Sequence, residues 1–148
     1  MNNKKNNLLL ISIKPQYAKK IFEGEKTIEL RKSAPQMVDN ESYMLIYVTS
    51  PVKELWGVCK IQSIIKNEPE IIWSKYGKVA GISKEDFNDY YKETTNGYVI
   101  ELKEVKALVN AISLEELRVM IPGFTAPQTY RYIDEELINN DNLKKLLI

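Results

Sequence analysis

Residues 24–31 read GEKTIELR, and this stretch joins a predicted helix to a predicted strand. Upstream, Pro15 suits the first turn of a helix, and Gly24 favours the left-handed conformation that ends helices. Downstream, two apolar residues alternate with Glu29 and Arg31, and a period of two predicts a strand with one apolar and one charged face. The stretch therefore predicts a helix, a tight turn and a strand in immediate succession.

The same signals divide the rest of the chain into short strands and short helices. Strands are predicted at residues 8–13, 26–31, 43–49, 55–65, 98–105 and 125–133, and helices after Pro15, Pro69, Ser83, Ser113 and Asp134. Residues 32–41 are polar and predict a loop, and Gly57 predicts a bulge or a close backbone approach. This order indicates an α+β fold, a small mixed β-barrel or curled sheet of five to six strands with flanking helices.

The domain division follows from composition along the chain. Residues 1–7 form a polar tail, residues 8–133 form one domain, and residues 134–148 form a C-terminal amphipathic helix that we expect to pack on that domain. The apolar run at 8–13 is too short for a signal peptide or a membrane span, so we expect a cytoplasmic protein with no membrane partner.

Composition removes several classes of function. The 148 residues hold 21 Lys and Arg against 20 Asp and Glu, a net charge of +1 that provides no strong field to attract a polyanion. The absence of histidine excludes Ser-His-Asp sites and histidine-ligated metals, and the single cysteine, Cys59, excludes intrachain disulfides and cysteine-cluster metal sites. We expect no metal and no cofactor, and acid–base chemistry is left to Asp, Glu, Lys or Tyr.

Three ionic side chains of the opening stretch are the candidate site. Glu29 and Arg31 share one strand face and lie about 7 Å apart along the chain, and the turn brings Lys26 to the same side. Together they offer a cation, an acceptor and a forked donor to one pocket. The same spacing also fits an exposed ion pair with a solvated lysine, which would contribute only about 0–1 kcal/mol.

The spacing of these residues resembles a known family signature. Gly24-x-Lys26-x-x-Glu29-x-Arg31 is similar to the GxKxxExR motif of the ASCH (activating signal cointegrator homology) domain, of the PUA-like superfamily. Residues 12–18, 46–53 and 126–132 also resemble conserved blocks of the longer prokaryotic members. The resemblance implies a PUA-like barrel whose cleft is lined by Lys26, Glu29 and Arg31 and binds RNA or nucleotides. Some members are amidohydrolases acting on N4-acetylcytidine, and a nuclease activity is known for another.

The leading hypothesis is a domain that recognises a base or a short single-stranded RNA, because the charge balance disfavours long polyanions. Further candidate ligand-binding residues are Lys14, Tyr47, Ser50, Gln128 and Tyr130. An amidohydrolase acting on acylated nucleosides is an alternative, with Lys26 and Glu29 as its catalytic groups, although Glu29 occupies the place of the family's nucleophilic threonine. Whether the chain is an enzyme stays open. A second alternative is a protein-interaction module that docks a partner through residues 134–148.

Overall fold

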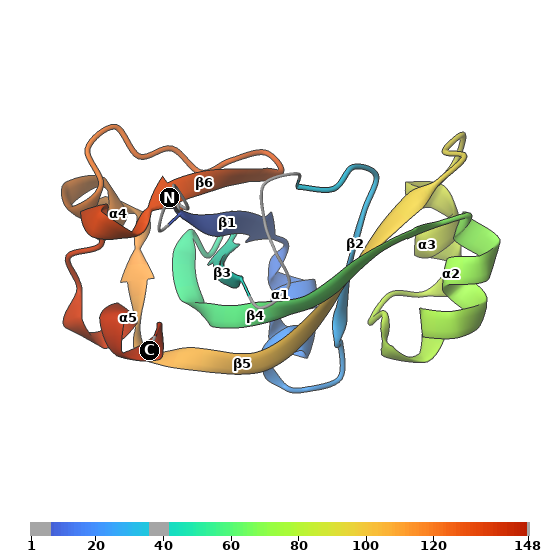
Figure 1. The fold of residues 1–148 in the computed structure, drawn as a ribbon, viewed down its shortest axis with the longest axis horizontal. Coiled ribbons are helices and arrows are strands. Elements are labelled where there is room, and N and C mark those ends of the chain that lie inside the picture. Colours follow the sequence, from blue (N-terminus) through green and yellow to red (C-terminus); the bar gives the residue numbers. More distant parts are fainter. Residues whose placement is uncertain (1–6, 36–41, 148) are drawn as a thin grey trace, which may run out of the picture.

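The computed structural model describes residues 7–35 and 42–147 as a mixed sheet with short helices (Figure 1). The strands are β1 (Asn7–Ile13), β2 (Ile28–Arg31), β3 (Tyr43–Val48), β4 (Glu54–Asn67), β5 (Gly97–Ser113) and β6 (Tyr130–Asp134), in the sheet order β2-β5-β4-β3-β1-β6. The helices are α1 (Pro15–Phe22), α2 (Pro69–Tyr76), α3 (Lys84–Tyr90), α4 (Leu114–Met120) and α5 (Asp141–Leu146), with 3-10 turns η1 (Gly77–Val79) and η2 (Glu135–Leu137). The predicted α+β class and six strands are confirmed.

The sheet curls, so that its edge strand β2 approaches β1, the fifth strand in the sheet order. β1 and β3 are parallel and the other ladders are antiparallel. Within the described residues no ladder joins β2 to β1 or to β6, so hydrogen-bonded closure of a barrel stays a prediction. The Arg31 side chain of β2 nevertheless donates to the backbone carbonyl of Ser12 in β1 at 2.8 Å. We call this gap, bridged by side chains, the β1–β2 seam.

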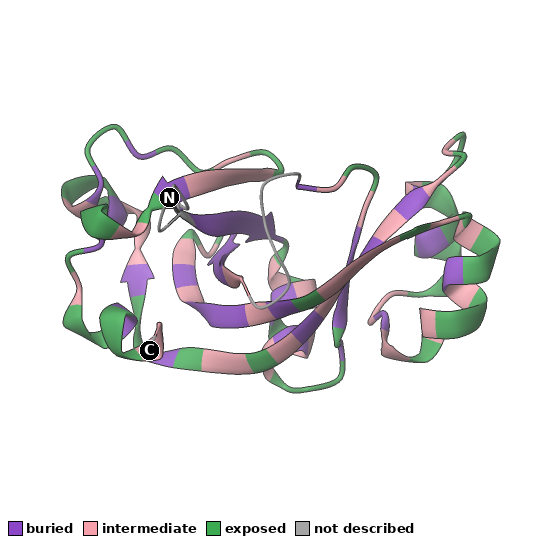
Figure 2. Cartoon of the chain, viewed as in Figure 1, coloured by how far each residue is buried: buried purple, intermediate pink, exposed green. Residues whose placement is uncertain are grey.

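The apolar residues form three clusters along the sheet. A central cluster packs α1 on the inner faces of β1, β3, β4 and β5, and a second gathers α4, α5 and β6 at one end. The third packs α2 and α3 around the far ends of β4 and β5, which run through the length of the molecule (Figure 1). Burial is densest along β1 and β3 in the middle (Figure 2), where both strands read as continuous apolar runs. No described helix has the length and apolarity to cross a membrane.

The predicted strands at 26–31 and 55–65 form with changed ends, as Ile28–Arg31 and Glu54–Asn67, and the largest differences in length are in β5 and β6. β5 continues to Ser113 instead of ending at Val105, because Ile112 and Ser113 pair with the first residues of β4. The last strand begins at Tyr130 instead of Thr125, because β6 follows β1 only as far as Ile11 in the register. The ends of both strands are set by pairing with distant strands, and the local sequence pattern does not predict that pairing.

The C-terminal segment is not one helix. The turn η2 and the helix α5 are separate, and Asn140 caps α5 by accepting from the backbone N–H of Leu143. Asparagine favours such caps over helix interiors, which explains the interruption. Ile138 and Leu143 are buried in the end cluster, whereas Leu137 of the predicted apolar stripe is exposed.

The expectation of a close backbone approach at Gly57 is confirmed. A Cβ atom there would lie 2.2 Å from the carbonyl oxygen of Lys106 and 2.8 Å from the ring of Phe22. The ladders on both sides of β4 shift register next to Gly57, as a bulge requires. The predicted loop at 32–41 and tail at 1–7 lie largely outside the described residues.

Candidate functional site: a buried ionic triad

The junction predicted at residues 24–31 forms as a helix, a turn and a strand. Helix α1 ends at Phe22, and Gly24 adopts a φ of +85°, in the left-handed region that glycine enters without strain. The backbone N–H of Lys26 then bonds back to the carbonyl of Lys20, and that of Thr27 bonds to the carbonyl of Val79. These bonds fix the turn, so that β2 starts at Ile28 with Glu29 and Arg31 on one face.

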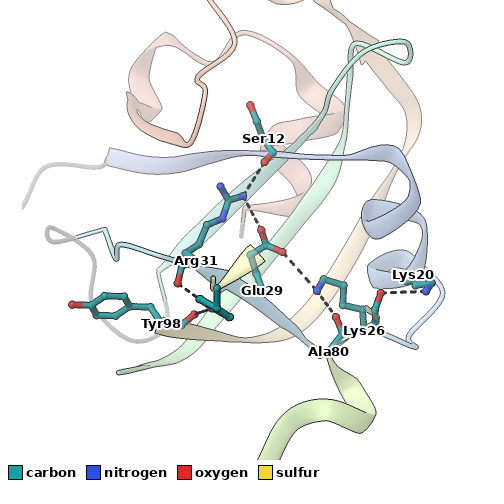
Figure 3. Close-up of polar contacts among 9 residues, drawn as sticks. Ser12, Lys20, Lys26, Glu29, Arg31, Ala80 and Tyr98 are labelled. Carbon is teal, nitrogen blue, oxygen red and sulfur yellow. Dashed lines mark hydrogen bonds and ion pairs between the residues drawn. The ribbon is translucent and has the colours of Figure 1, made fainter. Parts of the chain in front are cut away.

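Lys26, Glu29 and Arg31 converge in the structure, and we refer to them as the triad (Figure 3). Glu29 Oε2 lies 2.7 Å from Arg31 Nη2, and Glu29 Oε1 lies 3.9 Å from Lys26 Nζ. Their side chains expose 3%, 9% and 12% of their surface, in sequence order. The interpretation as an exposed ion pair is therefore wrong, because the carboxylate is held between two cations inside the protein.

Lys26 is held at both its stem and its ammonium group. Lys26 Nζ donates to the carbonyl of Ala80 at 2.5 Å and lies 5.5 Å from the centre of the Tyr17 ring. Burial lowers the pKa of Lys26; Glu29 opposes this, and the neighbouring charges of Arg31 and Lys20 add to it. The ammonium form of Lys26 is thus less favoured here than on the surface.

Arg31 spans the β1–β2 seam. The same Nη2 atom that meets Glu29 also donates to the Ser12 carbonyl at 2.8 Å, while the backbone carbonyl of Arg31 accepts from the Tyr91 hydroxyl at 3.1 Å. The Nε of Arg31 is buried and has no hydrogen-bond partner among the residues that the structure describes. A buried donor without an acceptor costs about 1–3 kcal/mol, so a ligand atom that accepted from Arg31 Nε would be stabilised there.

The charges of the triad do not cancel. Lys26 and Arg31 each carry +1 and Glu29 carries −1, so the buried group holds one excess positive charge. Each carboxylate oxygen faces one cation, and Arg31 Nε is a buried donor that meets no acceptor among the described residues. The arrangement is suited to accept an anion or a carbonyl oxygen, rather than the exocyclic amino group of a base.

Within the described residues, no hydrogen bond or ion pair joins the other predicted site residues to the triad. Tyr47 is buried in the end cluster with its ring 6.2 Å from that of Phe124, so it is not placed to stack on a ligand. Lys14, Ser50 and Gln128 are exposed in separate turns. Tyr130 lies against the central cluster and donates its hydroxyl to the carbonyl of Ala34 at 3.0 Å.

The expected cleft around the triad stays a prediction. Cavities of about 470 Å³ and 310 Å³ lie elsewhere on the described surface, one beside α2 and α3 and one beside α4. The triad instead lies beneath the surface, with Arg31 as its most accessible member.

Several residues that contact the triad were not identified from the sequence. Ser12 and Ala80 contribute backbone carbonyls, which carry no side-chain signal. Lys20 donates to the neighbouring carbonyl of Gly81 at 3.1 Å, and in the sequence it is one of two adjacent lysines at the end of a helix. Only Gly81 has a pattern that could have been read, as a turn residue ahead of α3.

Comparison with known proteins supports the class that fold and motif define: the structure is that of an ASCH domain. The crystal structure of ASCH from Zymomonas mobilis superimposes with a TM-score of 0.86 at 28% identity, covering 95% of this chain and 96% of that one. The family model described as "Domain of unknown function (DUF365)" matches residues 9–124. The chain therefore belongs to the DUF365 family of ASCH domains, and the resemblance noted in the sequence is confirmed.

Two curated relatives carry names connected with RNA. The ASCH domain-containing ribonuclease of Zymomonas mobilis is 29% identical over 127 residues, covering 86% of this chain and 84% of that protein. The large ribosomal subunit protein uL22 of Ureaplasma parvum is 29% identical over 126 residues, covering 84% of this chain but 39% of that protein.

Proposed function

We propose that this chain is an RNA- or nucleotide-binding domain whose triad receives one phosphate or carbonyl oxygen of a short single-stranded RNA. The observation that carries the proposal is the composition of the triad, two cations around one carboxylate, with an Arg31 donor that has no partner within the described residues. An anion placed there would offset the excess positive charge and accept from Arg31 Nε. The likeness to a protein named as a ribonuclease supports RNA as the source of that anion.

The small net charge of the chain limits how many phosphates it can engage. With a net charge of +1, the chain lacks the basic surface that long polyanions require. For one phosphate contact on single-stranded RNA, we expect a plot of log affinity against log salt concentration to have a slope of about −0.7. A steep slope would indicate a multi-phosphate surface elsewhere on the protein.

The test compares two lysine variants in binding of a fluorescent six-nucleotide RNA. Lys26→Met removes one cation and leaves the Glu29–Arg31 pair balanced, so the fold is retained while affinity falls roughly 10- to 100-fold. Lys144→Met removes the same charge from the exposed surface of α5 and should leave the affinity within about twofold. Equal affinities for both variants would contradict the assignment of the site.

Cleavage of the RNA is a second candidate, supported by the name of the Zymomonas relative and by the lowered pKa of Lys26. A general base requires the free amine, and the lowered pKa makes this form of Lys26 easier to reach than that of an exposed lysine. The same RNA, incubated with each variant and resolved on a denaturing gel, measures this directly. Loss of cleavage in Lys26→Met but not in Lys144→Met supports catalysis at the triad, whereas intact RNA with the wild-type protein restricts the function to binding.

The amidohydrolase alternative has its own test. Release of acetate from N4-acetylcytidine would support the amidohydrolase alternative. The interaction-module alternative loses most of its surface, because Ile138 and Leu143 pack into the domain itself.

A further inference from the structure

Residues 79–81, between η1 and α3, are bonded to the segment that carries Lys26. The carbonyls of Val79, Ala80 and Gly81 accept from the Thr27 backbone N–H, Lys26 Nζ and Lys20 Nζ, respectively. Three consecutive carbonyls therefore meet residues 20–27, as Figure 3 shows for the two lysine ammonium groups. We call residues 79–81 the carbonyl turn.

Gly81 brings the carbonyl turn against the stem of Lys26. Its φ is +67°, and a Cβ built on it would lie 2.9 Å from Lys26 Cβ and 3.0 Å from both Cγ and Cδ. These are the carbons nearest the Lys26 backbone, which is itself bonded to Lys20. The stem therefore cannot yield to a methyl group by moving only its flexible end.

We propose that Gly81 is a positioning residue for Lys26. Because Gly81 has no side chain, it leaves room for the lysine stem in the position where the ammonium group meets both the Ala80 carbonyl and Glu29. The consequence for ligands rests on the proposed function of the triad, but the placement of Lys26 does not. Any side chain at position 81 would push the stem outward and separate Lys26 from its two partners.

Gly123 provides a matched control elsewhere in the chain. Its φ is +74°, close to that of Gly81, and a Cβ built on it meets no atom within 4 Å. Gly123→Ala therefore introduces the same backbone strain without a collision, and Gly81→Ala introduces both. The difference between the two variants isolates the contact with Lys26.

The first measurement is the pKa of Lys26. It is determined by an NMR titration of the Lys26 side-chain nitrogen in each folded variant. Burial, together with Arg31 and Lys20, depresses this pKa, while Glu29 raises it and Tyr17 lies beside the amine. Gly81→Ala should move the pKa toward 10.5 as the amine becomes hydrated, and Gly123→Ala should leave it in place. An unchanged pKa in folded Gly81→Ala overturns the proposal, whatever RNA does.

The second measurement is a double-mutant cycle in RNA affinity with Lys26→Met. If Gly81 acts through Lys26, Gly81→Ala weakens binding roughly 10- to 100-fold in the wild-type background and has no further effect beside Lys26→Met. Additive losses would contradict the proposal. If Lys26→Met alone leaves RNA binding intact, the proposed function fails while the pKa measurement still decides the role of Gly81. Should Gly81→Ala fold too poorly, Gly81→Asn gives the same comparison against Gly123→Asn, because asparagine tolerates a positive φ better than alanine and carries the same Cβ.

Discussion

Two regions of the curled sheet are closed by opposite chemistry. At the end formed by α4 and α5, the side chains of Leu117, Ile138 and Leu143 fill the space and are almost completely buried. At the β1–β2 seam, Lys26 and Glu29 are buried nearly as deeply. Both arrangements exclude water, but they do so at very different cost.

Apolar burial stabilises a fold by about 25 cal/mol per Å² removed from water, whereas charges must first lose their hydration. Replacing a buried ionic cluster with apolar side chains of similar volume is often neutral or stabilising. The end cluster is therefore explained by stability. Stability alone does not explain the triad, and its excess positive charge agrees with the binding role that we propose.

The largest expected effect on stability comes from Glu29→Ala. This change leaves Lys26 and Arg31 buried without a counter-charge, and we expect the free energy of unfolding to fall by about 3–5 kcal/mol. Denaturant unfolding measures it. A loss below about 1 kcal/mol would mean that the triad is hydrated in solution. The contrast between the triad and the apolar end cluster would then disappear.

A somewhat smaller loss is expected at the apolar end. Leu143→Ala creates a cavity in the end cluster, where the leucine is fully buried, and should cost roughly 3 kcal/mol. RNA affinity of the folded variant should stay within about twofold of wild type, since α5 lies in another cluster from the triad. If this variant lost both stability and RNA affinity, the end cluster and the triad would be coupled.

The smallest effect tests whether the interior beside Glu29 is dry. Burial raises the pKa of Cys59 from 9.0 to about 12, and the charge of Glu29 contributes to the rise. Between these values the unfolded thiol ionises and the folded thiol does not, so raising the pH through this window destabilises the fold. From pH 8 to pH 10, wild type should lose about 1 kcal/mol more than Cys59→Ala. Identical pH dependence in the two proteins would indicate that water reaches Cys59.

The sequence predicts the local structure of the site well because that structure depends on neighbours. Alternation in residues 26–31 gives β2, and a glycine at position 24 ends the preceding turn. The helix predicted after Ser113 likewise forms, and its capping box joins Ser113 and Glu116, which are three residues apart. Signals of this kind are complete within a few residues of chain.

The partners of the triad could not be predicted in the same way. Lys26 bonds to a carbonyl 54 residues away, and Arg31 bonds to one 19 residues away. Every residue carries a backbone carbonyl, so sequence alone does not distinguish these two. Tyr47 was a candidate ligand-binding residue, but its ring is buried, because helix α4 and Phe124 cover that face of the sheet.

Replacing the whole triad separates binding from stability most directly. In the variant Lys26→Met, Glu29→Leu, Arg31→Met, no charge is left buried at the seam, and the apolar side chains have similar volumes. We expect its free energy of unfolding to lie within about 1 kcal/mol of wild type or above it, with binding of the six-nucleotide RNA lost. A variant that unfolds, or a folded variant that binds this RNA as tightly as wild type, would contradict the assignment of the triad to ligand binding.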